Sequence, residues 1–192
     1  MRSEGTICVE RYFRESGIQR VAVVGAGTMG AQIASLAAQS GRIVVLHDVS
    51  AEALHRGLER ARTEILPAIA ASGMLAEAPA GATERLHAAP DLAEAVREAD
   101  LVIEAVREDL ETKRQVFAEL SRLAPRTTIL ATNSSSLPSA PLAEVVEGPE
   151  RVLNMHFFAP VWVRSMLELM SSGQTSEDVM RRARAFGRSL GL

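Results

Sequence analysis

The chain has 192 residues, of which 47% are hydrophobic and 23% charged, and its formal net charge is −3. This composition is typical of a soluble α/β domain, and the net charge indicates no large basic surface for nucleic acid. The sequence has no apolar run long enough to span a membrane. The single cysteine, Cys8, allows no disulfide within the chain, which favours a reducing compartment such as the cytoplasm.

The first segment, residues 1–19, carries charged residues throughout and lacks the apolar stretch of a secretory signal. We interpret it as an extension, helical or frayed, before the first strand. Residues 20–192 are then the predicted domain. It begins with the apolar run Val21–Val24, which is typical of a short buried strand.

A glycine-rich segment, Gly25-Ala26-Gly27-Thr28-Met29-Gly30, follows this strand directly and precedes a predicted helix. In this context the first glycine allows a tight turn, the second lets the backbone approach a pyrophosphate, and the third lets the helix pack closely on the strand. The helix N-terminus offers free N–H groups to the phosphates. The segment therefore predicts dinucleotide binding, and a glycine turn without a ligand is the less favoured alternative.

A second apolar strand, residues 42–47, leads to Asp48. An acidic residue at the tip of this strand can hydrogen-bond both ribose hydroxyls of an adenosine and repels a 2′-phosphate. No arginine follows Asp48, because the next residues are Val49, Ser50 and Ala51. The sequence therefore predicts NAD rather than NADP.

Helices and strands alternate along the rest of the chain. The predicted elements are a helix from Ser50 that Pro67 bends or ends, a poor strand over 82–87, a helix over 91–99, a strand over 100–106, a helix from Asp109, a strand over 127–132, a short helix over 141–146, strands over 151–157 and 166–170, and a final helix from Ser176. Such alternation predicts an α/β fold, a Rossmann-like doubly wound and mostly parallel sheet with helices on both faces. Ligands bind such sheets where the carboxyl ends of the strands meet.

Four further stretches follow the glycine segment in order: Ala99–Val106, Ala131–Leu137, His156–Pro160 and Met166–Leu169. Together they resemble the NAD-binding domain of the L-3-hydroxyacyl-CoA dehydrogenases over about residues 19–192. The resemblance implies an NAD-dependent oxidoreductase of the fatty-acid β-oxidation type. Its substrate would be an acyl-CoA-like molecule, (S)-3-hydroxyacyl-CoA, converted reversibly to 3-oxoacyl-CoA.

The resemblance also implies roles for individual residues. His156 matches the catalytic base, Glu168 matches the carboxylate that orients it, and Ser135 matches a hydroxyl close to the substrate and the nicotinamide. The implied cofactor contacts, besides the three glycines, are Ala26, Thr28, Met29, Asp48, Val106, Arg107, Glu108, Lys113 and Ser135. A histidine suits proton removal near neutral pH, NAD accepts a hydride, and nothing in the sequence has the spacing of a metal site.

Structural interpretations of the same residues remain open at this point. A histidine beside two phenylalanines is often a hydrogen-bonded core residue, and Ser134–Ser136 could form only a polar turn. Glu108 and Lys113 could be an ion pair on a helix surface. A buried carboxylate at residue 168 would fix the imidazole tautomer, but strand alternation also allows Glu168 to face water.

Two departures from the family separate the alternative functions. Ala159 stands where the family usually has an asparagine beside the nicotinamide, and a methyl group cannot form a hydrogen bond. The chain also ends before the strand and helical domain that the resemblance implies for the acyl pocket and dimer contacts. Both departures favour a non-catalytic NAD-binding module as an alternative, and a dehydrogenase of a small non-CoA hydroxy acid or ring alcohol is the other alternative. A homodimer or a separate helical domain would complete the 3-hydroxyacyl-CoA dehydrogenase that the resemblance implies.

Overall fold

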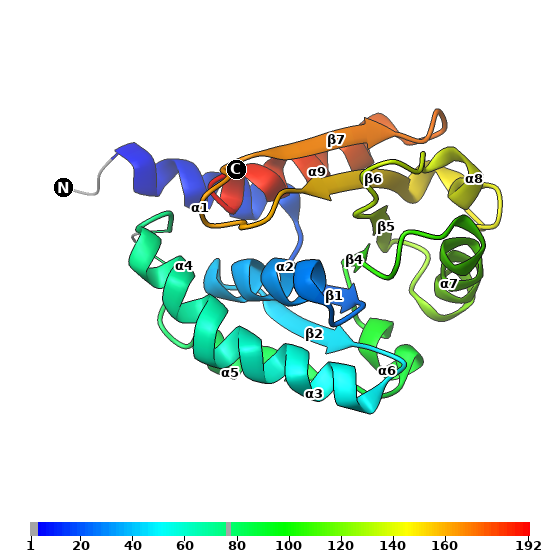
Figure 1. Ribbon diagram of the computed structural model, residues 1–192. Helices are drawn as coiled ribbons and strands as arrows, with labels where there is room; N and C mark the ends of the chain where they lie inside the picture. The colour runs from blue at the N-terminus through cyan, green and yellow to red at the C-terminus, as the bar shows by residue number, and fades with distance from the viewer. Residues whose placement is uncertain (1–3, 76–77) are drawn as a thin grey trace.

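The computed structural model describes residues 4–75 and 78–192 (Figure 1). Its strands form one seven-stranded sheet in the order β3-β2-β1-β4-β5-β6-β7. The strands are β1 Arg20–Val24, β2 Ile43–His47, β3 Leu86–Ala88, β4 Leu101–Glu104, β5 Ile129–Thr132, β6 Val152–Phe157 and β7 Leu167–Ser171. Neighbouring strands are parallel except β6 and β7, which are antiparallel. The strand order reverses beside β1, which is where such sheets bind ligands.

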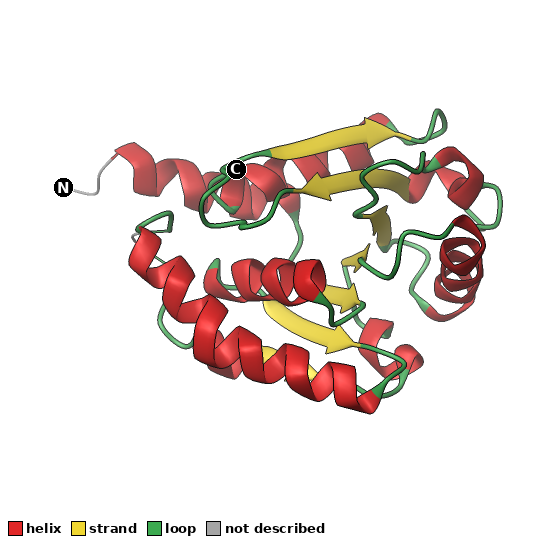
Figure 2. Ribbon diagram, in the orientation of Figure 1, coloured by secondary structure: helices red, strands yellow, loops and turns green. Residues whose placement is uncertain are grey.

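Helices cover both faces of the sheet (Figure 2). They are α1 Glu4–Ser16, α2 Thr28–Gln39, α3 Ala51–Arg60, the π-helix η1 Ala61–Ile65, α4 Leu66–Ser72, α5 Ala82–Arg85, α6 Leu92–Val96, α7 Leu110–Leu123, α8 Ala140–Ala143, the 3₁₀-helix η2 Pro149–Arg151 and α9 Glu177–Ser189. Alternate residues of β1 serve two cores, because strand side chains point to opposite faces. Val21 and Val23 pack with α2, α4 and α9, and Ala22 and Val24 pack with α6, α7 and α8. The predicted fold class is confirmed.

The N-terminal extension is helical as α1, which lies along α9 although almost the whole chain separates them (Figure 1). The Arg182 Nε–H of α9 donates to the carbonyl oxygen of Ser16 at 3.0 Å. The Arg188 guanidinium lies over the Tyr12 ring, 5.1 Å from its centroid. Helix α1 therefore packs against the last helix of the domain.

The helical structure that begins after Ser50 does not end at Pro67, because it continues through a π-turn and α4 to Ser72. The bend expected at Pro67 stays a prediction. The π-turn directly precedes the proline, and in it the Leu66 N–H donates to the carbonyl oxygen of Ala61, five residues back. A proline ring clashes with the carbonyl four residues earlier in a regular α-helix. The wider turn gives the ring room and removes that clash.

The predicted strand over 82–87 is also partly wrong, because residues 82–85 form the short helix α5 and only Leu86–Ala88 pair with β2. The Arg85 side chain closes this helical turn by donating to the carbonyl oxygens of Pro79 and Ala80 at 2.8 and 2.6 Å. These contacts favour the turn over an extended strand. No described helix has the length and apolar character needed to cross a membrane.

Candidate active site

The glycine segment forms the turn between β1 and α2, and its geometry fits a dinucleotide. Gly25 has a φ of +105°, and a Cβ there would lie 2.6 Å from the carbonyl oxygen of Ala105. A Cβ on Gly30 would lie 1.7 Å from the carbonyl oxygen of Gly25, so the helix packs closely on the turn. A Cβ on Gly27 would meet no atom within 4 Å. The Gly27 backbone therefore faces the open space that an approaching pyrophosphate requires.

Asp48 follows β2 and is held beside this turn. Its Oδ2 accepts the Ala26 N–H at 2.8 Å, and its Oδ1 accepts the Ser50 N–H at 2.9 Å. Helix α2 begins with no side-chain cap and no acidic residue in its first turn. Its N-terminus is therefore suited to an anionic group, while the carboxylate of Asp48 is preorganised near it.

Strand register brings the predicted base and its carboxylate together. His156 of β6 lies directly opposite Glu168 of β7, and His156 Nδ1 is 3.0 Å from Glu168 Oε2. The Phe158 ring packs on the imidazole with a centroid distance of 4.2 Å. The Glu168 side chain is 51% exposed, so the expectation of a buried carboxylate is wrong. Its strand is the edge of the sheet, where one side has no covering strand.

A cavity of about 330 Å³ opens at the carboxyl ends of β4, β5 and β6. The predicted site residues that line it are Met29, Val106, Glu108, Lys113, Ser135 and His156. Ala159 and Asn133 also contribute to its wall. The Asn133 Oδ1 accepts the Phe157 N–H at 2.8 Å and so joins the loop that follows β5 to the last residue of β6. The fold thus gathers six of the fourteen predicted site residues around one cavity, and Glu168 contacts one of them, His156.

Glu108 binds the serine turn, which we define as residues 134–136. Its Oε1 accepts the N–H groups of Ser135 and Ser136 at 3.2 and 3.1 Å, the Ser136 hydroxyl at 3.0 Å, and the Ser134 hydroxyl. Burial alone would raise the pKa of the Glu108 carboxyl, but the hydrogen bonds from Ser134 and Ser136 and the charge of Lys113 outweigh it and lower this pKa to about 2. Glu108 is therefore an anion that fixes the turn presenting Ser135.

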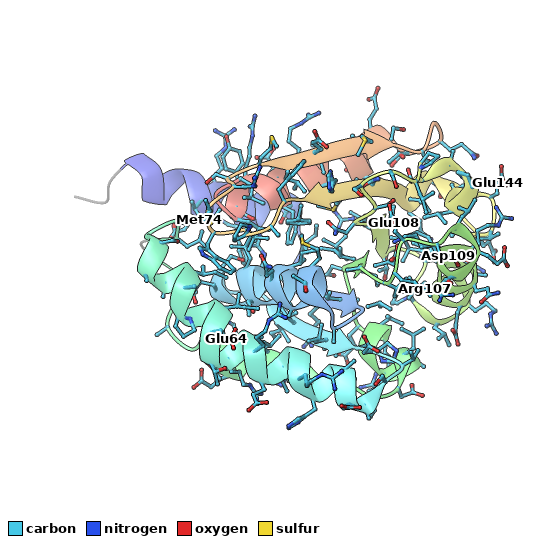
Figure 3. The ribbon with its side chains drawn as sticks, in the orientation of Figure 1. Glu64, Met74, Arg107, Glu108, Asp109 and Glu144 are labelled. Carbon is cyan, nitrogen blue, oxygen red and sulfur yellow. The ribbon has the colours of Figure 1, made fainter. Side chains whose placement is uncertain are left out.

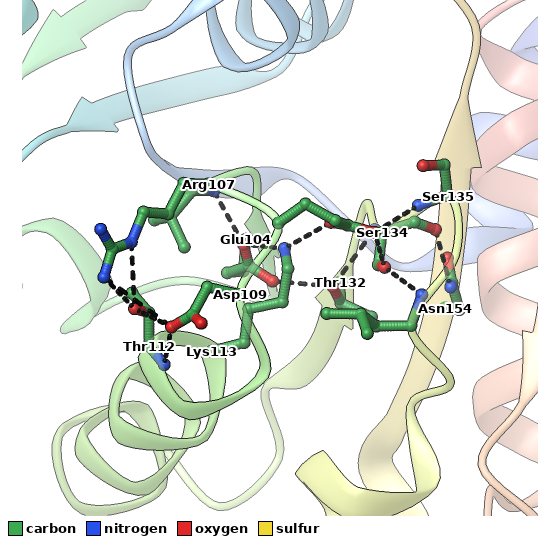
Figure 4. Close-up of polar contacts among 12 residues, drawn as sticks. Glu104, Arg107, Asp109, Thr112, Lys113, Thr132, Ser134, Ser135 and Asn154 are labelled. Atoms are coloured by element: carbon green, nitrogen blue, oxygen red, sulfur yellow. Dashed lines mark hydrogen bonds and ion pairs between the residues drawn. The ribbon is translucent and has the colours of Figure 1, made fainter.

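Lys113 lies inside the protein, so the interpretation of a surface ion pair is wrong. Its Nζ is 2.7 Å from Glu104 Oε1 and 3.4 Å from Glu108 Oε2, and the Lys113 and Glu104 side chains are 1% and 0% exposed (Figure 4). No role for Glu104 was predicted from the sequence. The position of this charged residue at the end of the apolar run Leu101–Ile103 could have indicated burial, and a buried carboxylate needs a partner.

The side chain of Arg107 does not reach the cavity. Its Nε and Nη2 donate to Thr112 Oγ1 at 3.2 and 3.0 Å, and its Nη2 is 3.8 Å from Asp109 Oδ1 (Figure 4). Arg107, Glu108 and Asp109 all lie between β4 and α7 (Figure 3). Within this segment only Glu108 turns its carboxylate toward the serine turn. The cofactor contact expected of Arg107 stays a prediction.

Comparison with known proteins agrees with this geometry. The chain is 39% identical over 165 residues to 3-hydroxyadipyl-CoA dehydrogenase of Escherichia coli K12, an alignment that covers 86% of this chain and 34% of that protein. It is 38% identical to a probable 3-hydroxybutyryl-CoA dehydrogenase of Bacillus subtilis, over 90% of this chain and 61% of the relative. The chain therefore spans between a third and two thirds of these relatives.

Solved structures of related enzymes also match most of this chain. The structure of 3-hydroxybutyryl-CoA dehydrogenase from Escherichia coli K12 matches with a TM-score of 0.79 and 38% identity, over 91% of this chain and 37% of that one. A diketoreductase matches with a TM-score of 0.83 and 35% identity, over 91% of this chain and 62% of that one.

The sequence profile described as "3-hydroxyacyl-CoA dehydrogenase, NAD binding domain" matches residues 20–192. This match begins at the first residue of β1 and includes the glycine turn, the serine turn and the His156–Glu168 pair. It confirms NAD as the cofactor of the family. The chain belongs to the family of NAD-binding domains of the 3-hydroxyacyl-CoA dehydrogenases.

Proposed function

We propose that this chain is the NAD-binding part of a dehydrogenase that interconverts (S)-3-hydroxyacyl-CoA and 3-oxoacyl-CoA. The observation that carries the proposal is the 3.0 Å contact between His156 Nδ1 and Glu168 Oε2 at a cavity that Ser135 also lines. An imidazole held at Nδ1 by a carboxylate keeps Nε2 available for a proton. The relatives' names, which specify CoA-thioester dehydrogenases, support the substrate class.

The protein residues handle the proton of this reaction, and bound NAD supplies the hydride acceptor. His156 Nε2 accepts the proton of the substrate hydroxyl as the hydride leaves the neighbouring carbon. Glu168 stabilises the imidazolium that forms. The Ser135 hydroxyl donates a hydrogen bond to the reacting oxygen. In the reverse direction His156 returns the proton to the carbonyl oxygen.

The proposed cofactor site extends from the glycine turn, residues 25–30, and Asp48 to Val106, Glu108, Lys113 and the backbone of Arg107. The open space beside Gly27 and the uncapped start of α2 support binding of the pyrophosphate. The two hydrogen bonds that fix Asp48 support recognition of the adenosine ribose.

A helical domain or a second copy of the chain would complete the acyl pocket, and the extra length of the relatives supports such an addition. A role in fatty-acid β-oxidation agrees with the name of a glyoxysomal β-oxidation multifunctional protein of Brassica napus that the chain matches at 32% identity. A cytoplasmic location belongs to the same proposal, and the single cysteine supports it.

Oxidation of NADH in the presence of acetoacetyl-CoA tests the proposal. His156→Ala should lower kcat at least about a hundredfold, because it removes the general acid–base group. The matched control is His55→Ala, since His55 is an exposed histidine of α3. Equal rates for wild type and His156→Ala would remove His156 from the mechanism, and a comparable loss in His55→Ala would indicate damage to the fold.

A second candidate is a dehydrogenase of a small non-CoA hydroxy compound. The match to a diketoreductase that acts on dicarbonyl compounds supports it. The methyl group of Ala159 in the cavity wall instead favours a non-catalytic NAD-binding module, because the family's usual polar contact is missing there. Turnover of small 3-oxo acids but not of acetoacetyl-CoA would support this candidate. Binding of NADH in calorimetry, with no turnover of either substrate, would instead indicate a non-catalytic NAD-binding module.

A further inference from the structure

Glu104 is a fully buried carboxylate at the last position of β4, directly beneath the proposed active site. Its Oε1 accepts the Lys113 ammonium and the Val106 N–H, each at 2.7 Å, and its Oε2 accepts the Thr132 hydroxyl at 2.7 Å. The two oxygens are thus hydrogen-bonded to α7, to β5 and to the segment that follows β4. The carboxylate is held rigidly between β4, β5 and α7.

Lys113 is the only lysine in the chain, and the other cationic side chains are arginines. Its compact ammonium lies between the carboxylates of Glu104 and Glu108, at 2.7 and 3.4 Å. A planar guanidinium is a wider group that forms two parallel hydrogen bonds rather than a point contact. This narrow position between two strands and a helix is therefore suited to lysine.

Glu108 connects the Glu104–Lys113 ion pair to the serine turn. Four donors of residues 134–136 converge on its Oε1. On its other side the turn is held by Asn154, whose Nδ2 donates to the Ser134 carbonyl oxygen at 2.9 Å (Figure 4). The position of Ser135 thus depends on where the Glu108 carboxylate lies, and Lys113 is the cation that holds that carboxylate.

We propose that Glu104 is a positioning residue of the site: through Lys113 it holds Glu108 against the serine turn and so sets the place of Ser135. The inference rests on the proposed dehydrogenase function for its catalytic consequence. A displacement of about 1 Å in a reacting group can cost two orders of magnitude in rate. The ion pairs Glu104–Lys113 and Lys113–Glu108, which we call the Glu104–Lys113–Glu108 network, prevent that displacement.

The test is Glu104→Gln, which keeps the size of the side chain and removes its charge. The amide hydrogen exchange of Ser135 and Ser136 should accelerate about tenfold, because their acceptor is no longer fixed. The kcat should fall about tenfold or more, while KM for NADH changes less than kcat. A purely structural role would lower stability without this division between kcat and KM.

The single lysine provides a readout that needs no substrate. In a sample labelled with ¹⁵N-lysine, the side-chain ammonium gives one resonance, and Glu104→Gln should shift it and accelerate its exchange with water. Glu111→Gln is the matched control, because Glu111 is an exposed carboxylate of the same helix that accepts a hydrogen bond from Gln115. This control should leave the resonance, the amide exchange and kcat unchanged.

Thr132→Val is the second variant and decides the matter if Glu104→Gln does not fold. It changes no charge and removes the Thr132 hydroxyl, which donates to Glu104 Oε2 at 2.7 Å and accepts the Ser134 N–H at 3.2 Å. Amide exchange in the serine turn should therefore accelerate for both reasons, and a shift of the lysine resonance separates the change at Glu104 from the lost contact to Ser134. Wild-type exchange at Ser135 and Ser136, with an unchanged lysine resonance, in every variant that folds would overturn the proposal. A wild-type protein without dehydrogenase activity would contradict the proposed function alone, because the exchange and lysine measurements still test the Glu104–Lys113–Glu108 network.

Discussion

Two cations lie fully buried at opposite ends of the sheet, and the protein stabilises them in different ways. Lys113, at the carboxyl ends of the strands, is paired with the carboxylates of Glu104 and Glu108. Arg42 directly precedes β2, at the amino end, and is 0% exposed. It donates to the carbonyl oxygen of Ile18 at 3.4 Å and to the hydroxyls of Ser40 and Ser189 at 2.8 and 2.5 Å.

Arg42 also lies between two aromatic rings, with its guanidinium carbon 4.0 Å from the Phe13 centroid and 5.1 Å from the Phe186 centroid. Its partners in the described part of the chain are therefore neutral. Burial lowers the pKa of the Arg42 guanidinium to about 9. The comparison indicates that Arg42 joins α1, β2 and α9, whereas Lys113 organises the candidate site.

The largest expected effect comes from Lys113→Met. This change leaves Glu104 as a buried carboxylate without its cation, and breaking a buried ion pair in this way costs about 3–5 kcal/mol. Urea denaturation measures the loss. Arg122→Met, an exposed cation of the same helix, is the control and should stay within about 0.5 kcal/mol of wild type. A loss as small as that of the control would mean that the Glu104–Lys113 pair contributes nothing.

Arg42→Met should have a smaller effect on the free energy of unfolding, about 1–2 kcal/mol. The variant loses three hydrogen bonds, but it keeps apolar contact with Phe13 and Phe186 and removes the cost of burying an unpaired charge. NADH affinity should not change, because Arg42 lies at the opposite end of the sheet from the cavity. A cost above that of Lys113→Met would reverse the comparison.

Glu108 contributes an acid dependence of stability that should be smaller than these two losses, because its side chain is 37% exposed and water screens its charge. The folded pKa of Glu108, about 2, lies below the usual value of about 4.3 for an unfolded glutamate. A lowered pKa adds stability that is fully present above the unfolded value and is lost as the pH falls toward 2. Denaturation curves between pH 6 and about 2.5 should therefore show a shallower decline in Glu108→Gln than in wild type. The same decline in both proteins would contradict the assignment.

Features that depend on near neighbours in the chain could be predicted from the amino-acid sequence. The spacing of Gly25, Gly27 and Gly30 after an apolar strand predicted the turn and its ligand class, because each glycine is required by local backbone geometry. Alternating helical and strand patterns predicted the doubly wound sheet. The caps at Ser50, Asp109 and Ser176 were likewise readable, since a capping side chain bonds within its own first turn.

The contacts between side chains far apart in the sequence could not be predicted, because they depend on how strands and helices pack. Glu168 reaches His156 through the antiparallel register of β6 and β7, and a slip of one residue would move it to the other face. Arg42 meets Ser189 across 147 positions of sequence. Lys113 was predicted as a cofactor contact, but its burial and its pairing with Glu104 follow from how α7 packs on β4. Strand pairing and helix packing choose such partners, and they depend on the whole fold rather than on the local pattern.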